Sequence, residues 1–66
     1  MLKEMLLEQR EFNKEELRTL MATEGYELIE NHNNKLVFGQ LFDEDDIIII
    51  DYYKIDGNLI YINNVL

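Results

Sequence analysis

Residues 47–65 have the sequence IIIIDYYKIDGNLIYINNV, and this stretch decides the fold. It is rich in β-branched and aromatic residues, which favour strands, and Asp56-Gly57 lies in its middle. An Asp-Gly pair suits a type I′ turn, in which φ is positive at both central residues. The stretch therefore predicts a β-hairpin with strands at 47–55 and 58–65.

Two further runs of the same character precede this hairpin, at 26–31 and 35–42. The links between the runs are short and consist of turn-forming or charged residues: His32-Asn33-Asn34 and Asp43-Glu44-Asp45-Asp46. Short links join neighbouring antiparallel strands. Residues 26–66 are therefore expected to form a four-stranded antiparallel β-meander.

Residues 1–25 have a helical period instead, with apolar residues at i, i+3 and i+4. We expect helices at 2–11 and 14–24. Asn13 is a good N-cap for the second helix, and Gly25 suits the left-handed residue that commonly follows a helix. The predicted fold is α+β, with two N-terminal helices (1–25) followed by the meander (26–66). Both helices cover one face of the sheet.

The length and composition limit what such a chain can do. A chain of 66 residues allows one domain, residues 1–66, with a small core. It has no Cys, so it cannot form a disulfide, and a single His without Cys argues against a zinc site. No cofactor or metal is predicted. The longest aliphatic run is only Ile47 to Ile50, and no basic, apolar leader is visible at the start, so we expect a cytoplasmic protein.

Residues with catalytic potential are scarce. The chain has no Ser or Cys, and the hydroxyls of Thr19 and Thr23 lie in a predicted helix without a nearby base. His32, in a predicted turn, is either a general base or, more commonly for such a position, a solvated surface residue. Carboxylate pairs could act as acid and base only in a concave pocket, for which a domain of this size has little room. The sequence predicts no catalytic residue and no enzyme.

The strongest signal is the charge. Six basic and fourteen acidic residues give a net charge of −8, and residues 26–66 contain eight of the acids but only two bases. Such a surface repels nucleic acid and attracts a basic surface on another protein. The alternative is that the acidity only keeps the protein soluble.

The run Asp43-Glu44-Asp45-Asp46 is the densest acidic feature. It allows three interpretations: oxygen ligands for Ca²⁺ or Mg²⁺, an exposed hairpin tip that discourages edge-to-edge association, or an anionic contact with a basic partner. In the third, Asp51 and Asp56 also contact the basic partner.

Alternation along the predicted strands places ten apolar residues on each face of the sheet. Two short helices can cover one face only, and we assign them to the face rich in Phe and Ile. The uncovered face would then contain Tyr26, Tyr52 and Tyr61. Because tyrosine is enriched at protein interfaces, these three residues predict an apolar interface, unless they simply pack at the rim of the sheet.

Together these features predict a small acidic protein-binding module. A series of carboxylates on a rigid sheet can stand in for the phosphates of a nucleic acid. In size, charge and α+β layout the chain resembles the small acidic proteins with which phages block bacterial defence enzymes, such as anti-CRISPR and anti-restriction proteins, although no motif is shared. The alternatives are a homodimer formed through the tyrosine face, or an antitoxin or immunity protein that masks a basic toxic enzyme.

Overall fold

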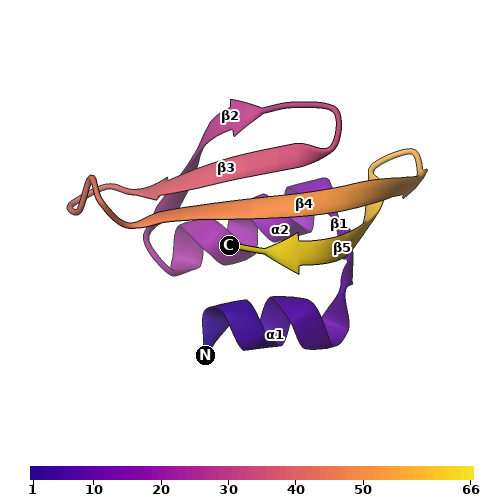
Figure 1. Cartoon of the computed structure of the whole chain (residues 1–66), viewed down its shortest axis with the longest axis horizontal. Coiled ribbons are helices and arrows are strands. Elements are labelled where there is room, and N and C mark those ends of the chain that lie inside the picture. Colours follow the sequence, from indigo (N-terminus) through magenta and orange to yellow (C-terminus); the bar gives the residue numbers. More distant parts are fainter.

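The computed structural model describes residues 1–66 and contains two short helices and a curved antiparallel sheet (Figure 1). Neither helix is long and apolar enough to cross a membrane. In the view of Figure 1, α2 lies behind the sheet and α1 lies below β5. The elements in chain order are α1 (Leu2–Gln9), β1 (Glu11–Asn13), α2 (Lys14–Thr23), β2 (Tyr26–Asn31), β3 (Lys35–Gln40), β4 (Ile47–Asp56) and β5 (Leu59–Val65).

The sheet has five strands, in the order β1-β5-β4-β3-β2, and forms a half-barrel. The prediction of a four-stranded meander is therefore wrong. The additional strand is β1, which lies between the two helices in the sequence and pairs with β5 through Phe12 and Ile60. Three residues are too few to show a strand period, so the segment resembled a simple break between helices.

Arg10 directs the chain from α1 into β1. Its φ is +62°, which is unusual for a residue other than Gly. Its backbone N–H donates to the Leu6 carbonyl at 2.9 Å, and its carbonyl accepts from the N–H of Ile62 at 2.8 Å. Its guanidinium donates to the Ile62 carbonyl at 3.0 Å. Arg10 thus ends the first helix at Gln9, two residues earlier than predicted, and connects it to β5.

The second helix agrees closely with its prediction. The Asn13 side chain accepts a hydrogen bond from the backbone N–H of Glu15 at 2.9 Å, which confirms Asn13 as the N-cap. The helix ends at Thr23, and Gly25 follows with φ +89°. Local capping chemistry therefore determines both ends of α2.

Two glycines should respond in opposite ways to substitution by Ala. At Gly25 the added Cβ would combine a positive φ with a 2.9 Å approach to the side chain of Gln40. Gly25→Ala should lower the free energy of unfolding by about 1–2 kcal/mol. At Gly39 φ is not positive, and the nearest side-chain atom, from Ile29, would be 3.4 Å away. Gly39→Ala should therefore raise the free energy of unfolding by about 0.5 kcal/mol.

Urea unfolding of both variants, followed by circular dichroism, tests this pair. Equal destabilisation by the two substitutions would contradict the difference in backbone conformation between the two sites.

The core lies between the inner face of the sheet and the helices. Both helices contribute, α1 through Leu6 and α2 through Leu17 and Met21. The remaining buried members of the core cluster come from the strands: Phe12, Leu36, Phe38, Ile48, Ile50, Tyr52, Ile60 and Ile62.

The predicted distribution of residues between the two faces is wrong for β2 and β4. A four-residue loop at 43–46 would place Phe42 opposite Ile47, but Gly39 lies opposite Ile47 in the structure. This shift of three residues is odd, so it exchanges the two faces of β4 relative to β3. As a result Ile48, Ile50 and Tyr52 point into the core.

Three register shifts complete the correction. The turn after β2 has its expected register, with Asn31 opposite Leu36, but the pairing shifts between Leu28 and Glu30. The first half of β2, including Tyr26, therefore packs against the core. The pairing of β4 with β5 shifts between Asp51 and Tyr52 and again between Lys54 and Asp56. The hairpin turn consists of Gly57-Asn58 instead of Asp56-Gly57.

Candidate functional site

The loop between β3 and β4, residues 41–46, has a defined conformation. At its base the N–H of Gln40 donates to the Asp46 carbonyl at 3.1 Å. The side chain of Asp43 accepts from the N–H of Asp45 at 3.1 Å, and the Asp43 carbonyl accepts from the N–H of Asp46 at 3.1 Å. Asp commonly stabilises turns by hydrogen bonding to the backbone two residues on. We refer to residues 41–46 as the acidic loop.

A tyrosine from β2 anchors the acidic loop. The hydroxyl of Tyr26 donates to a carboxylate oxygen of Asp46 at 2.8 Å, and the N–H of Leu41 donates to the Gly25 carbonyl at 3.3 Å. Partial burial and, secondarily, the hydrogen bond to Asp46 raise the pKa of Tyr26 above its usual value. The loop is thus attached to the strand that follows α2.

Tyr26 should make the stability depend on pH in the alkaline range. Because its folded pKa is raised, the protonated hydroxyl contributes stability fully below the unfolded pKa of about 10. This contribution is lost as the pH rises through the folded pKa. Between about pH 9 and pH 11, the wild type should therefore lose more stability than Tyr26→Phe.

Urea unfolding across this pH range measures the difference directly. The other three tyrosines are present in both proteins, so the gap between the two curves reports on Tyr26. Parallel curves for wild type and Tyr26→Phe would contradict the role of the Tyr26–Asp46 hydrogen bond.

The acidic loop also exposes two apolar side chains. Phe42 is 98% exposed and Leu41 is 60% exposed, whereas Phe38, four residues before Phe42, is 1% exposed. Burial of such a side chain is worth about 1.5–3 kcal/mol. The loop therefore presents an unburied aromatic residue next to four carboxylates.

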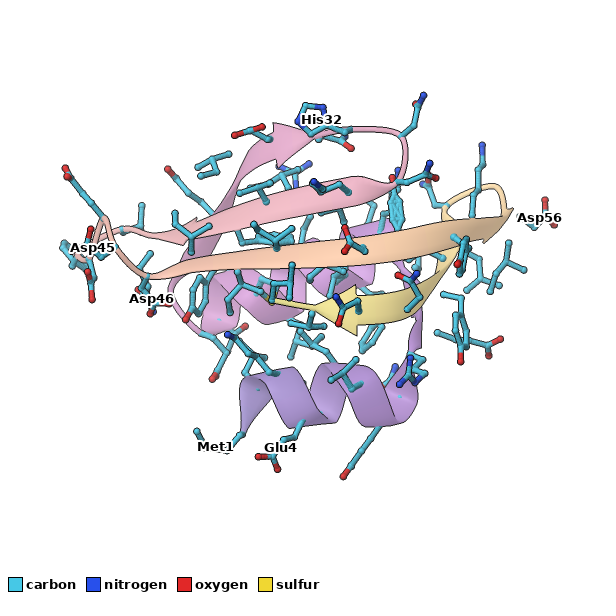
Figure 2. All side chains as sticks on the ribbon, viewed as in Figure 1. Met1, Glu4, His32, Asp45, Asp46 and Asp56 are labelled. Carbon is cyan, nitrogen blue, oxygen red and sulfur yellow. The ribbon has the colours of Figure 1, made fainter.

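The six acids predicted to contact a partner do not gather in one place. Figure 2 shows Asp45 and Asp46 at one end of the molecule and Asp56 at the other, along a longest extent of 33 Å. Asp51 lies within β4, opposite Lys35 of β3 and Asn64 of β5. Only the four consecutive residues Asp43, Glu44, Asp45 and Asp46 form a cluster, and no three acids converge where a metal ion could bind.

The three tyrosines predicted to form an interface do not share a face. Tyr52 is 2% exposed in the core, and its hydroxyl donates to the His32 carbonyl at 3.0 Å. Tyr26 packs against the same core. Only Tyr61 lies on the outer face, opposite Tyr53. The predicted tyrosine face is therefore wrong, and self-association through it loses its structural basis.

The remaining residues considered for chemistry have ordinary local partners. The ring of His32 contacts the carboxylate of Glu30 at 2.8 Å, and both side chains are exposed. The hydroxyls of Thr19 and Thr23 donate to backbone carbonyls one turn earlier in α2, at 3.1 and 3.0 Å.

Phe42 is the candidate residue that the sequence prediction missed, because the assumed register placed it on the helix-covered face. One feature of the sequence could have indicated its exposure. Phe42 directly precedes a run of four acids, where the strand can already have ended. Comparison with protein-family models, with curated proteins and with solved structures finds no match.

Proposed function

We propose that this chain is a protein-binding module that docks through the acidic loop onto a partner protein with an apolar pocket bordered by Lys and Arg. The observation that carries the proposal is the 98% exposure of Phe42 on a loop held by its own hydrogen bonds. Buried aromatic side chains are among the residues that contribute most to protein interfaces. A loop already fixed in shape loses little entropy on binding.

The charge of the molecule supports a basic partner. The net charge is −8, and Asp43, Glu44 and Asp45 are exposed beside Phe42. Carboxylates around an apolar anchor accelerate encounter with a positive surface and disfavour other partners. Positive surfaces of this kind commonly bind nucleic acid. The proposed action is therefore inhibition, in which the module occupies a nucleic-acid-binding surface of its target.

Site-specific photocrosslinking tests the proposal. A photoreactive phenylalanine replaces Phe42 in one protein and Asn58 in a matched control. Asn58 is an exposed residue in the turn between β4 and β5. In a bacterial lysate, position 42 should crosslink to a discrete basic protein, and position 58 should not. Excess unlabelled wild type should suppress the crosslink, whereas excess Phe42→Ala should not.

The purified target then supplies the functional measurement. Its binding to DNA or RNA should decrease as the module is added, and Phe42→Ala should have little effect. Crosslinking that is equal at both positions, or that wild type and Phe42→Ala suppress equally, would exclude the acidic loop as the docking site. A target whose nucleic-acid binding does not change would exclude inhibition.

A further inference from the structure

The face of the sheet that points away from the core carries a second apolar area. Val37 is 7% exposed but is not part of the core cluster, so neighbours on the outer face must cover it. Across the strands Val37 lies opposite Ile49, and Ile49 exchanges two backbone hydrogen bonds with Leu66 at 3.1 and 2.8 Å. Directly opposite residues in a sheet share a face.

Gly39 leaves room in this area for neighbouring side chains. It lies opposite Ile47, and a Cβ at Gly39 would be 3.4 Å from the Ile29 side chain and 3.5 Å from that of Ile47. Two isoleucines therefore close over the space that a larger residue would fill. Ile29 is 49% exposed and Ile47 is 37% exposed. We define the outer patch as Ile29, Val37, Gly39, Ile47, Ile49 and Leu66.

Acidic residues border the outer patch on three sides. On the edge strand, Glu27 lies opposite Gly39 and Glu30 is paired with Val37. The acidic loop follows the patch where β3 leads into β4, next to the Gly39–Ile47 pair. Asp51 borders the third side, opposite Lys35. An apolar centre within a charged rim has the anatomy of a binding interface.

This rim favours a different protein over a second copy. Two copies placed face to face would bring Glu27, Glu30 and the acidic loop against like charges, and each copy carries −8. Like charges across an interface cost several kcal/mol. A basic rim on the partner would be attracted instead.

The sheet also limits the form of the partner. Val37, Gly39 and Ile49 lie on interior strands, whose backbones pair on both sides. No main-chain groups therefore remain in the middle of the patch for an added strand. A sheet face instead packs against a helix through side chains, as the inner face of this sheet does with Leu17 and Met21 of α2.

From these observations we propose that the outer patch binds an amphipathic helix of a partner protein, with an apolar stripe flanked by Lys and Arg. This inference deepens the proposed function. The acidic loop and the outer patch adjoin, so one basic partner can contact Phe42 and the patch together.

A defined peptide tests this inference. The probe is a synthetic Leu/Lys peptide with Leu at i, i+3, i+4 and i+7, which forms an apolar stripe on a helix. A scrambled peptide of the same composition is the control. In an NMR titration, the amphipathic peptide should shift amide signals of β2, β3 and the first half of β4. Equal binding of both peptides would overturn the inference, because it would show attraction by charge alone.

Substitutions in the outer patch test which residues contribute to peptide binding. Ile29→Thr and Ile47→Thr keep a β-branched side chain on the surface and should each weaken peptide binding about tenfold, equivalent to about 1.4 kcal/mol. Ile55→Thr is the matched control, since Ile55 is 47% exposed near the other end of β4. Unchanged affinity of both patch variants, or amide shifts at the groove lined by Met1, Leu2, Met5 and Leu20, would place the peptide elsewhere and overturn the inference.

The inference and the proposed function can fail separately. If Phe42→Ala weakens binding of the protein captured at position 42 but Ile47→Thr does not, the acidic loop binds the partner and the outer patch does not. If the peptide binds the patch but position 42 captures no protein, the patch is a helix-binding surface and the docking role of the loop is wrong.

Discussion

Phe38→Ala is expected to unfold a large fraction of the protein at room temperature. The Phe38 side chain is 1% exposed in β3, between Leu28 of β2 and Ile48 of β4. Truncation of a buried Phe to Ala costs about 3–5 kcal/mol. A domain of this length has a total stability of only about 3–10 kcal/mol. Circular dichroism during thermal and urea unfolding measures the loss.

No covalent support compensates for this loss, since the chain has no disulfide. The matched control is Phe42→Ala, which removes the same side chain from a position that is 98% exposed. Its midpoint of unfolding should equal that of the wild type. A midpoint for Phe38→Ala within a few degrees of the wild type would show that the sheet does not depend on the packing of β3.

The parts of the fold that depend on local chemistry could be predicted from the sequence. Asn13 caps α2 with its own side chain, and Gly25 takes the positive φ that follows the helix. Both effects act within a few residues, so the sequence around each site contains the required information. Asn33-Asn34 likewise gave the correct register for the end of β2.

The parts that depend on register could not be predicted. The register shifts near Ile29, Ile55 and Asn63 each leave one residue without a partner. None of the three is a Gly, the residue that often marks a bulge within a strand. Because both faces of the sheet are apolar, the usual alternation of apolar and polar residues does not reveal such a shift. The three-residue strand β1 depends on a partner, β5, that is nearly fifty residues away in the sequence.

The candidate site shows the same division. The acidic run was visible as a local feature, and the structure places it in a single loop. The prediction grouped this run with Asp51 and Asp56 on one compact surface. The length of β4 separates them, because its ten extended residues span about 30 Å. The exposure of Phe42 follows from where β3 ends, at Gln40, and this depends on the register with β4.

Phe42→Ala should weaken binding to the partner about 30-fold or more while leaving the fold unchanged. The wild-type loop presents Phe42 at 98% exposure, so binding can bury nearly the whole side chain. Truncation of an aromatic anchor at the centre of an interface costs 2 kcal/mol or more, and about 2 kcal/mol corresponds to about 30-fold in affinity. Titration calorimetry with the protein captured at position 42 measures the change.

The control and the salt dependence separate an apolar anchor from attraction by charge. Tyr53→Ala removes an aromatic side chain that is 60% exposed on β4, outside the loop, and should bind as the wild type does. Asp43→Asn with Glu44→Gln should mainly slow association and reduce its dependence on salt. The hydrogen bond from Tyr26 to Asp46 remains in this variant, so the loop keeps its attachment to β2. If Phe42→Ala binds as tightly as the wild type and the variant with Asp43→Asn and Glu44→Gln does not, the contact is electrostatic and Phe42 is not an anchor.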